Sequence, residues 1–303
     1  MAQVPATPKL QRVKTLMKAR LGDPESVAKE DGLQVSEISA LNLRAALADQ
    51  NSQPLAEQVI FLIPLVSPKD VTDWDAVTGR LNRTLQSFLD QTNPNWRAVV
   101  CCQERPPLPD DPRISYLPFD EPFEGNDKWR KLHHLADSLN AANDPAGYVM
   151  SFDADDLLHK GAVDHMLRTQ AKGGYLVEQG FVRDTAAGDI ALAGRPSLAL
   201  PLRKSFWKLC GSCVALRYDP EIKESTPFIQ AMTQHEHRMF PYLAKLAGLR
   251  LTALPEPMVL YELNHGENFG ERRGRVSFKT RFVQRFKISD LATLDGIDQN
   301  FPS

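Results

Sequence analysis

The sequence predicts an α/β protein with a doubly wound, mostly parallel sheet flanked by helices. Three observations predict this fold class. Short apolar runs alternate with helical patterns between residues 59 and 152, as buried strands and their crossover helices do. The chain has 303 residues, enough for one large α/β domain with additions, or for two domains. Hydrophobic residues make up 42% and charged residues 24%, as in ordinary globular proteins.

Charge and cysteine content exclude several classes of protein. There are 36 Lys+Arg and 38 Asp+Glu, so no positive excess favours a nucleic-acid partner. The apolar run Val59 to Val66 is too short to span a bilayer, and the first residues lack an apolar signal-peptide core. We therefore expect a cytoplasmic protein, with a peripheral contact at the inner face of a membrane left open. Cys210-Gly-Ser-Cys213 is interpreted as a turn before a strand rather than as a redox or zinc site.

Residues 1–55 are predicted to form a helical extension. Leu10, Val13, Leu16 and Met17 fall at helical spacing, which indicates a short amphipathic helix. We expect this helix to pack on the main domain and to turn its basic side to solvent. Membrane-surface or partner-docking roles stay open.

The segment after the extension alternates strands and helices. The strands are expected at Val59 to Val66, Trp96 to Glu104, Ile114 to Phe119 and Tyr148 to Phe152, and the helices at Trp74 to Gln91 and Lys128 to Ala142. In such sheets, ligands bind beyond the carboxyl ends of the strands.

The second half of the chain is more strand-like. Strands are expected at Tyr175 to Val182, Ile190 to Leu192, Ser212 to Arg217, Leu251 to Leu254 and from Met258, with a helix near Ile229 to Ala247. We divide the chain into a helical extension (1–55), a main domain (56–270) and a basic tail (271–303).

The sharpest chemical feature is the run Asp153-Ala-Asp155-Asp156, which follows the strand ending at Phe152. No basic residue adjoins it in the sequence, and carboxylates this close repel one another unless a cation is present. Mn²⁺ or Mg²⁺, which prefer oxygen ligands, would suit it. A solvated acidic turn, or a cap for a following helix, remains the alternative.

The order of the motifs resembles the family 2 glycosyltransferases of the GT-A fold. The resemblance covers roughly Val59 to Phe269. It rests on a strand with a proline (Phe61 to Leu65), SFLDQT (87–92), Trp96 before the second strand, YVMSFDADD (148–156) and LPEPMVLYELNHGEN (254–268). It implies a metal-dependent inverting transferase that moves a sugar from a nucleoside diphosphate, with UDP expected, to a hydroxyl of a glycan, lipid-linked or other acceptor.

The resemblance also implies site residues. Asp155 and His265 would bind the metal, here Mn²⁺ or Mg²⁺. The nucleotide-sugar site would include Pro64, Glu104, Lys131, Asp153, Asp156, Arg272 and Arg273, and the acceptor side would include Trp207 and Gly211. The basic residues between Arg272 and Lys287 could instead lie on an anionic membrane or form the solvated face of a helix.

The pattern leaves three candidates for the catalytic base. Relatives have two acidic residues at the start of the late helix, whereas this chain has the sequence Gln234 to Arg238 (QHEHR). The register of the downstream LAKLAG puts Glu236 in the place of the base. His235 and His237 are rivals because imidazole titrates near neutral pH. A catalytically degenerate module that binds a nucleotide or glycan, and a phosphate-handling DxD enzyme, are the alternative functions. The oligomeric state stays open.

Overall fold

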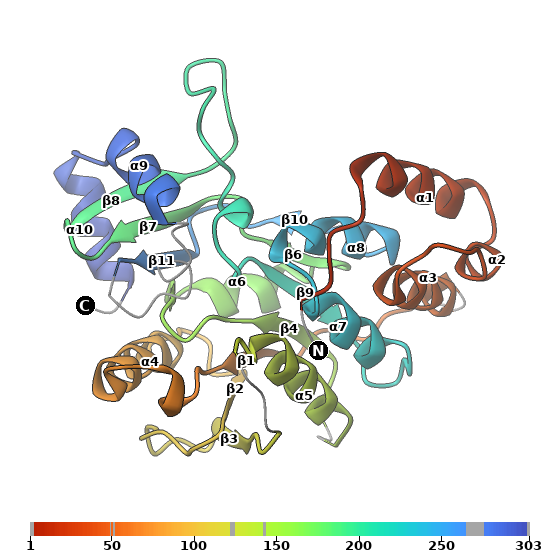
Figure 1. Ribbon diagram of the computed structural model, residues 1–303, viewed down its shortest axis with the longest axis horizontal. Coiled ribbons are helices and arrows are strands. Elements are labelled where there is room, and N and C mark those ends of the chain that lie inside the picture. The colour runs from red at the N-terminus through yellow and green to blue at the C-terminus, as the bar shows by residue number, and fades with distance from the viewer. Residues whose placement is uncertain are drawn as a thin grey trace.

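A seven-stranded sheet forms the centre of the computed structural model, which describes residues 3–48, 50, 52–121, 125–141, 144–264 and 276–301 (Figure 1). The strand order is β10-β6-β9-β4-β1-β2-β3. The strands are β1 (Gln58–Pro64), β2 (Trp96–Cys102), β3 (Ile114–Pro118), β4 (Gly147–Ser151), β6 (Gly174–Leu176), β9 (Val214–Tyr218) and β10 (Thr252–Ala253). β9 is antiparallel to β4 and β6, and the other described pairings in this sheet are parallel. The predicted α/β class, mostly parallel and flanked by helices, is confirmed.

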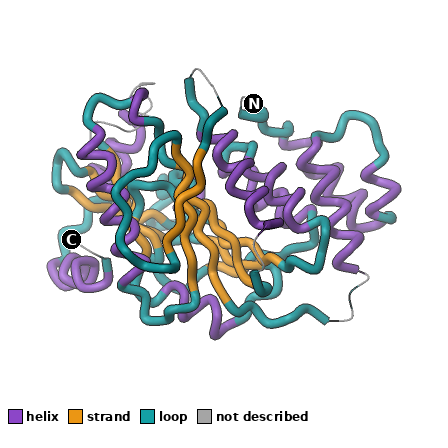
Figure 2. The backbone as a smooth tube through the Cα atoms, turned by 90° about the horizontal axis from the view of Figure 1, so that it is seen from below, coloured by secondary structure: helices purple, strands orange, loops and turns teal. Residues whose placement is uncertain are grey.

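Helices lie on either side of this sheet (Figure 2). They include α4 (Trp74–Leu89), α5 (Lys128–Ala141) and α6 (Ala162–Thr169). Val77, Leu81, Leu85 and Phe88 recur at helical spacing on α4 and are buried, which fixes the face that α4 turns inward. The Phe88 ring stacks on Phe61 of β1 with centroids 4.1 Å apart.

A second sheet has the order β5-β11-β7-β8. Its strands are β5 (Leu157–Leu158), β7 (Gly180–Asp184), β8 (Asp189–Ala193) and β11 (Val259–Leu263), and α9 (Val276–Arg285) and α10 (Leu291–Asn300) follow β11 in the chain. α9 packs on β7 and β8, while Ile297 of α10 joins a small core with Phe181 and Leu260. The single strand expected at Tyr175 to Val182 is wrong, because the chain leaves the main sheet after β6 and enters the second sheet at β7.

The N-terminal extension consists of α1 (Lys9–Leu21), α2 (Pro24–Ala28) and α3 (Val35–Ala48), which pack against α7 (Ser225–Thr233) and α8 (Phe240–Leu246). The expected helix near Ile229 to Ala247 is two helices, separated by the 3₁₀ turn η3 (His237–Met239). Two further 3₁₀ turns of the same length are η1 (Pro68–Asp70) and η2 (Phe206–Lys208). Within the described ranges, the helices are all too short or too polar to cross a bilayer.

The orientation of α1 differs from the expectation. Thr15 and Ala19 are its buried residues, whereas Leu10, Val13 and Met17 are exposed. The helix packs on α8 and its lysines are exposed, as expected, and Leu16 is half-buried against the core, but the other three apolar residues of the predicted face point outward.

Candidate active site at the carboxyl edge of the sheet

The strand directions bring two turns together at one edge of the main sheet. β1, β2 and β4 are parallel, so their carboxyl ends meet at this edge. β9 is antiparallel to β4, with Met150 opposite Ala215, so the residues that enter β9 lie beside those that leave β4. The acidic turn at residues 153–156 and the turn Cys210 to Cys213 are therefore neighbours. The prediction of a turn before a strand at Cys210 to Cys213 is confirmed, and both cysteines are buried free thiols.

Ser212 connects the two turns by hydrogen bonds. Its hydroxyl accepts from the backbone N–H of Asp153 at 2.8 Å and donates to Oδ2 of Asp156 at 2.5 Å. The Cys210 thiol donates to the same Oδ2 at 3.0 Å. Gly211 lies against Asp153, since an added Cβ would stand 3.0 Å from Asp153 Oδ2. The small residues of this turn thus hold the aspartates in place.

Asp156 is fully buried. Burial raises its pKa well above the usual value, and the charges of Asp155 and Asp153 raise it further. Its Oδ1 has no hydrogen-bond partner among the described residues. Burial in this turn therefore favours the protonated form of the Asp156 carboxyl, whereas Asp153 and Asp155 are half-buried.

Two lysines approach the aspartates from other elements. Lys128, the first residue of α5, places Nζ 2.5 Å from Oδ1 of Asp153. Burial acts to lower the pKa of Lys128, but Asp153, followed by Asp155 and Asp156, together outweigh burial, and the pKa lies above its usual value. Lys279 of α9 donates to the Tyr261 hydroxyl at 2.7 Å, and burial lowers the Lys279 pKa against the pull of Cys210 and the aspartates. The acidic turn therefore has basic neighbours in space that it lacks in sequence.

His237 joins this cluster. Burial, followed by the charges of Lys279 and Lys128, lowers the pKa of His237 to about 3, so the imidazole is neutral at physiological pH. A hydrogen bond to the Lys208 backbone opposes this shift, while Nε2 is buried without a partner among the described residues. With the ring neutral and the backbone bond assigned to the other nitrogen, Nε2 keeps a lone pair that can accept a proton.

The other two candidates for the base have different surroundings. Glu236 is 40% exposed and pairs with Arg238 at 3.3 Å. His235 is buried, and its Nε2 is 2.6 Å from the Ser36 hydroxyl of α3. The charges of Lys279 and Lys128 act on His237, which associates this candidate with the cluster.

The predicted nucleotide-binding residues are partly at this edge. Pro64 ends β1 opposite Cys101 and is buried. Lys131 is also fully buried and donates to the Leu65 carbonyl at 2.6 Å, so it fastens the end of β1. Glu104 is exposed in the loop after β2.

The remaining predicted residues can be placed only in part. Trp207 is half-buried on η2, with Lys208 Nζ 5.0 Å from its ring centroid. His265, Arg272 and Arg273 lie outside the described residues. The sequence reasoning missed Ser212 and Tyr261. A serine between the two cysteines and the tyrosine of the YELNHGEN run were the available signals.

The donor set fits a divalent cation only in part. Asp155 offers carboxylate oxygens beside two further aspartates, and hard divalent ions prefer such oxygens. Within the described part of the chain, no three His, Cys, Asp or Glu side chains gather to hold a metal. The residues therefore suit an ion that is held by one or two carboxylates and takes its other ligands from a bound diphosphate, as Mg²⁺ commonly is.

A broad open pocket of about 620 Å³ lies at the opposite, amino edge of the main sheet. Asn93, Asn95, Trp96 and Arg168 are among its lining residues. The acidic turn and its lysines are not part of it. We place the candidate site at the carboxyl edge, because ligands of parallel sheets bind there and the charged cluster lies there.

Comparison with known proteins gives weak similarities. No family model matches the sequence, and no curated protein matches it. A crystal structure of S. aureus TarS 1-349 shares 10% identity and a TM-score of 0.36, over 68% of this chain and 60% of that one. A second crystal structure, of S. aureus TarS, shares 12% identity and a TM-score of 0.36, over 75% of this chain and 43% of that one. A 4-diphosphocytidyl-2C-methyl-D-erythritol synthase shares 13% identity and a TM-score of 0.32, over 76% of this chain and all 100% of that one.

This chain thus spans less than two thirds of the length of either TarS chain. TM-scores this low assign no activity, so the function has to be inferred from the site itself.

Proposed function

We propose that the protein is a metal-dependent inverting glycosyltransferase that moves a sugar from a nucleoside diphosphate, with UDP as the expected nucleotide, to an acceptor hydroxyl. One observation carries the proposal: the acidic turn after β4 lies at the carboxyl edge with two lysines and an uncharged imidazole around it. This combination provides ligands for a cation, positive charge for a diphosphate and a proton acceptor.

In this proposal, Asp155 would hold Mn²⁺ or Mg²⁺, with His265 as the expected second ligand. A metal held there would supply positive charge against the leaving diphosphate. Lys128 and Lys279 add positive charge at the same place. Asp153, which the Lys128 ammonium holds, lies by the ribose or base, and Asp156 fixes the turn from inside.

The acceptor hydroxyl attacks the anomeric carbon from the face opposite the diphosphate, which inverts the configuration. Its proton passes to a base as the new bond forms. We assign this role to Nε2 of His237, with Glu236 as the alternative that the sequence register favours. Burial, the largest cause of the low His237 pKa, persists when a ligand binds, but an anionic diphosphate would offset the charges of Lys279 and Lys128 and so make the imidazole a stronger base.

Isothermal titration calorimetry tests whether UDP binding requires a metal. UDP is titrated once in the presence of Mn²⁺ and once in the presence of EDTA. We expect UDP binding that depends on Mn²⁺ in the unaltered protein and is lost in Asp155→Ala. Asp164→Asn on α6 is the matched control, since its carboxylate is 47% exposed and pairs only loosely with Arg168, at 3.7 Å. Equal UDP affinity with EDTA, or undiminished affinity in Asp155→Ala, contradicts the proposal.

Turnover distinguishes an enzyme from a binding module of the same fold. Release of free sugar from UDP-sugar donors in water, faster with Mn²⁺ than with EDTA, is the expected result for an active transferase. UDP binding with no sugar release and no transfer from any donor would identify a catalytically degenerate module instead.

A further inference from the structure

α1 turns an apolar stripe to solvent. Leu10, Val13, Met17 and Leu21 follow one another at spacings of three or four residues, and their exposed fractions are 74%, 56%, 58% and 81%. The opposite side of α1, with Thr15 and Ala19, packs toward α8. Surface helices of globular proteins usually bury their apolar side. This helix packs inward through Thr15, Ala19 and the half-buried Leu16, and its other leucines, its valine and its methionine face solvent.

Basic residues border the stripe on both sides. At 100° per residue, Lys9 and Arg20 lie on one side of the stripe and Lys14 on the other. All three are exposed. The helix sequence KLQRVKTLMKARL has no acidic residue. Long basic side chains beside an apolar stripe can extend toward charged headgroups while their alkyl stems lie along the acyl boundary.

We propose that α1 binds flat on an anionic lipid surface, with its apolar stripe in the headgroup and acyl boundary and its lysines against the lipid phosphates. The charge pattern favours this occupant over a second copy of the chain. A second copy related by two-fold symmetry would bring the same cations against each other, whereas an anionic membrane complements them. In Figure 1, α1 is at the outer end of the molecule, on the side away from the second sheet and α9, so the exposed helix is at the periphery of the fold.

This inference is independent of the proposed sugar transfer, because none of the site residues lies on α1. A protein without transferase activity could still bind lipid through α1, and the reverse also holds.

Co-sedimentation of the full chain with lipid vesicles tests the inference. Vesicles of phosphatidylcholine alone are compared with vesicles that also contain phosphatidylglycerol. We expect binding to the mixed vesicles that weakens with added salt, and little binding to phosphatidylcholine. Lys9→Gln combined with Lys14→Gln should weaken binding by about thirtyfold, as expected for two cations near an anionic surface.

Leu10→Gln combined with Met17→Gln should weaken binding by more than about tenfold, because it removes apolar surface from the stripe. Both side chains are exposed, so the thermal unfolding midpoint should not change, and circular dichroism checks this. Leu198→Gln is the control, since Leu198 is fully exposed on the loop between β8 and η2. Unaltered binding in the stripe variant, an equal loss in the control, or no preference for anionic lipid overturns the inference. A dimer in light scattering that the stripe variant dissociates would assign the stripe to a second copy and also overturns it.

Discussion

Ser212 links two of the three aspartates through a single hydroxyl group. It accepts a hydrogen bond from the Asp153 backbone and donates one to the buried carboxyl of Asp156. Because Ser212 is itself fully buried, no water replaces either bond if the hydroxyl is removed. The position of the acidic turn relative to β9 therefore depends on this one side chain.

We predict that Ser212→Ala lowers the free energy of unfolding by about 1–3 kcal/mol, the cost of leaving buried polar groups unpaired. Urea titration measures the change. Ser138→Ala is the control, because the Ser138 hydroxyl only bonds back to Leu135 within α5 and is half-buried. A loss in Ser212→Ala no greater than in Ser138→Ala would show that the hydroxyl does not support the turn.

The two hypotheses for the catalytic base, His237 and the adjacent Glu236, predict opposite effects of substitution on the transfer rate. If His237 is the base, His237→Gln should lower the transfer rate by about 10²–10⁴-fold with UDP affinity nearly unchanged, and Glu236→Gln should change the rate only a few-fold. Initial rates and UDP calorimetry on both variants provide the comparison. The reverse ranking would return the role to Glu236, as the sequence register predicts.

Sequence reasoning located the acidic turn but not its surroundings. Aspartates at the end of a buried strand are a local signal, whereas Lys128 is 25 positions away from Asp153 and reaches it only through the packing of α5. Which of His235, Glu236 and His237 faces the site also depends on the tertiary structure and not on the local sequence. Consecutive side chains around a 3₁₀ turn point in different directions, and the register of a neighbouring helix does not specify which one enters the site.

At the scale of elements, the N-terminal helices are fastened to α8 by a buried carboxylate. Glu37 of α3 accepts hydrogen bonds from the Tyr242 hydroxyl at 2.6 Å, the Thr7 hydroxyl at 3.1 Å and the Gln34 backbone at 2.9 Å. His235 contacts Ser36 beside it. One residue of the run expected to be catalytic therefore holds the N-terminal extension in place.

This interface should make stability depend on pH. Burial lowers the pKa of His235, against the opposing charge of Glu37 and with a smaller contribution from Arg12. The folded state thus favours the neutral imidazole, and its stabilisation is present above the unfolded pKa near 6.5 and is lost as pH falls toward the folded pKa. We predict that the contribution of His235 to the free energy of unfolding decreases on acidification from about pH 7 to pH 5, while the raised pKa of Asp156 acts in the opposite direction.

The change in the free energy of unfolding per pH unit should be smaller in His235→Gln, because a glutamine side chain does not bind a proton in this pH range. His237 has a lowered pKa of about 3 and acts in the same direction, so the slope is reduced rather than abolished. Denaturant titrations at several pH values measure both slopes. An unchanged slope in His235→Gln would mean that protonation at this interface does not affect folding.

Helices and strands with a regular spacing of apolar residues were predicted closely. Elements whose boundaries depend on tertiary contacts were not. The α4 pattern of buried residues is local and was predicted to within a turn. The division between β6 and β7 was missed because it depends on a close approach. At Gly180 an added Cβ would stand 2.3 Å from the Phe206 ring, and no local pattern reveals that contact.

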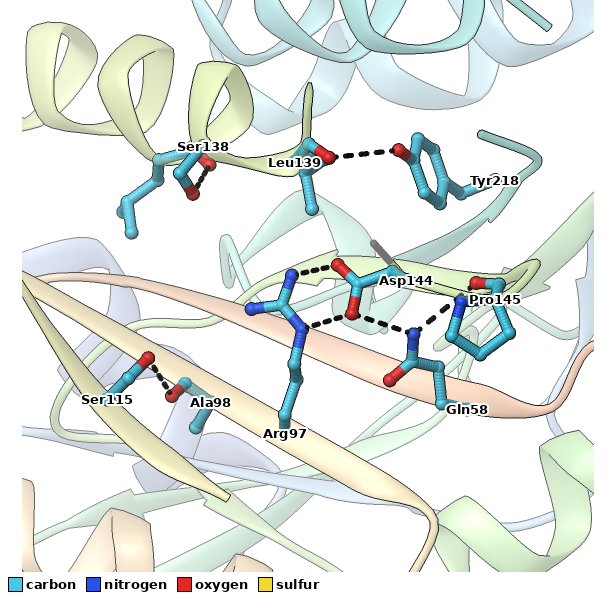
Figure 3. Close-up of polar contacts among 10 residues, drawn as sticks. Gln58, Arg97, Ala98, Ser115, Ser138, Leu139, Asp144, Pro145 and Tyr218 are labelled. Carbon is cyan, nitrogen blue, oxygen red and sulfur yellow. Dashed lines mark hydrogen bonds and ion pairs between the residues drawn. The ribbon is translucent and has the colours of Figure 1, made fainter. Parts of the chain in front are cut away.

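At the scale of the whole molecule, the carboxyl and amino ends of the strands in the main sheet have different roles. The carboxyl edge holds the acidic turn, while the amino edge carries an ion pair that fastens β2 to the loop before β4. In Figure 3, the Arg97 guanidinium faces the Asp144 carboxylate, which also accepts from Gln58 at 3.1 Å. Arg97 uses Nε and Nη2 for this pair, and both side chains are largely buried. Neither partner was recognised in the sequence, because the pair joins residues 47 positions apart.

We predict that Arg97→Met lowers the free energy of unfolding by about 2 kcal/mol, because it leaves the largely buried Asp144 carboxylate without its bidentate guanidinium partner. UDP affinity should stay unchanged, because the altered pair and the candidate site lie at opposite ends of the strands. Urea titration and calorimetry on the same variant measure the two quantities. Arg168→Met is the control. Its pair with Asp164 is exposed and 3.7 Å long, so the loss should be below about 1 kcal/mol. A fall in UDP affinity as large as that in Asp155→Ala would mean that the amino edge is not separable from the site.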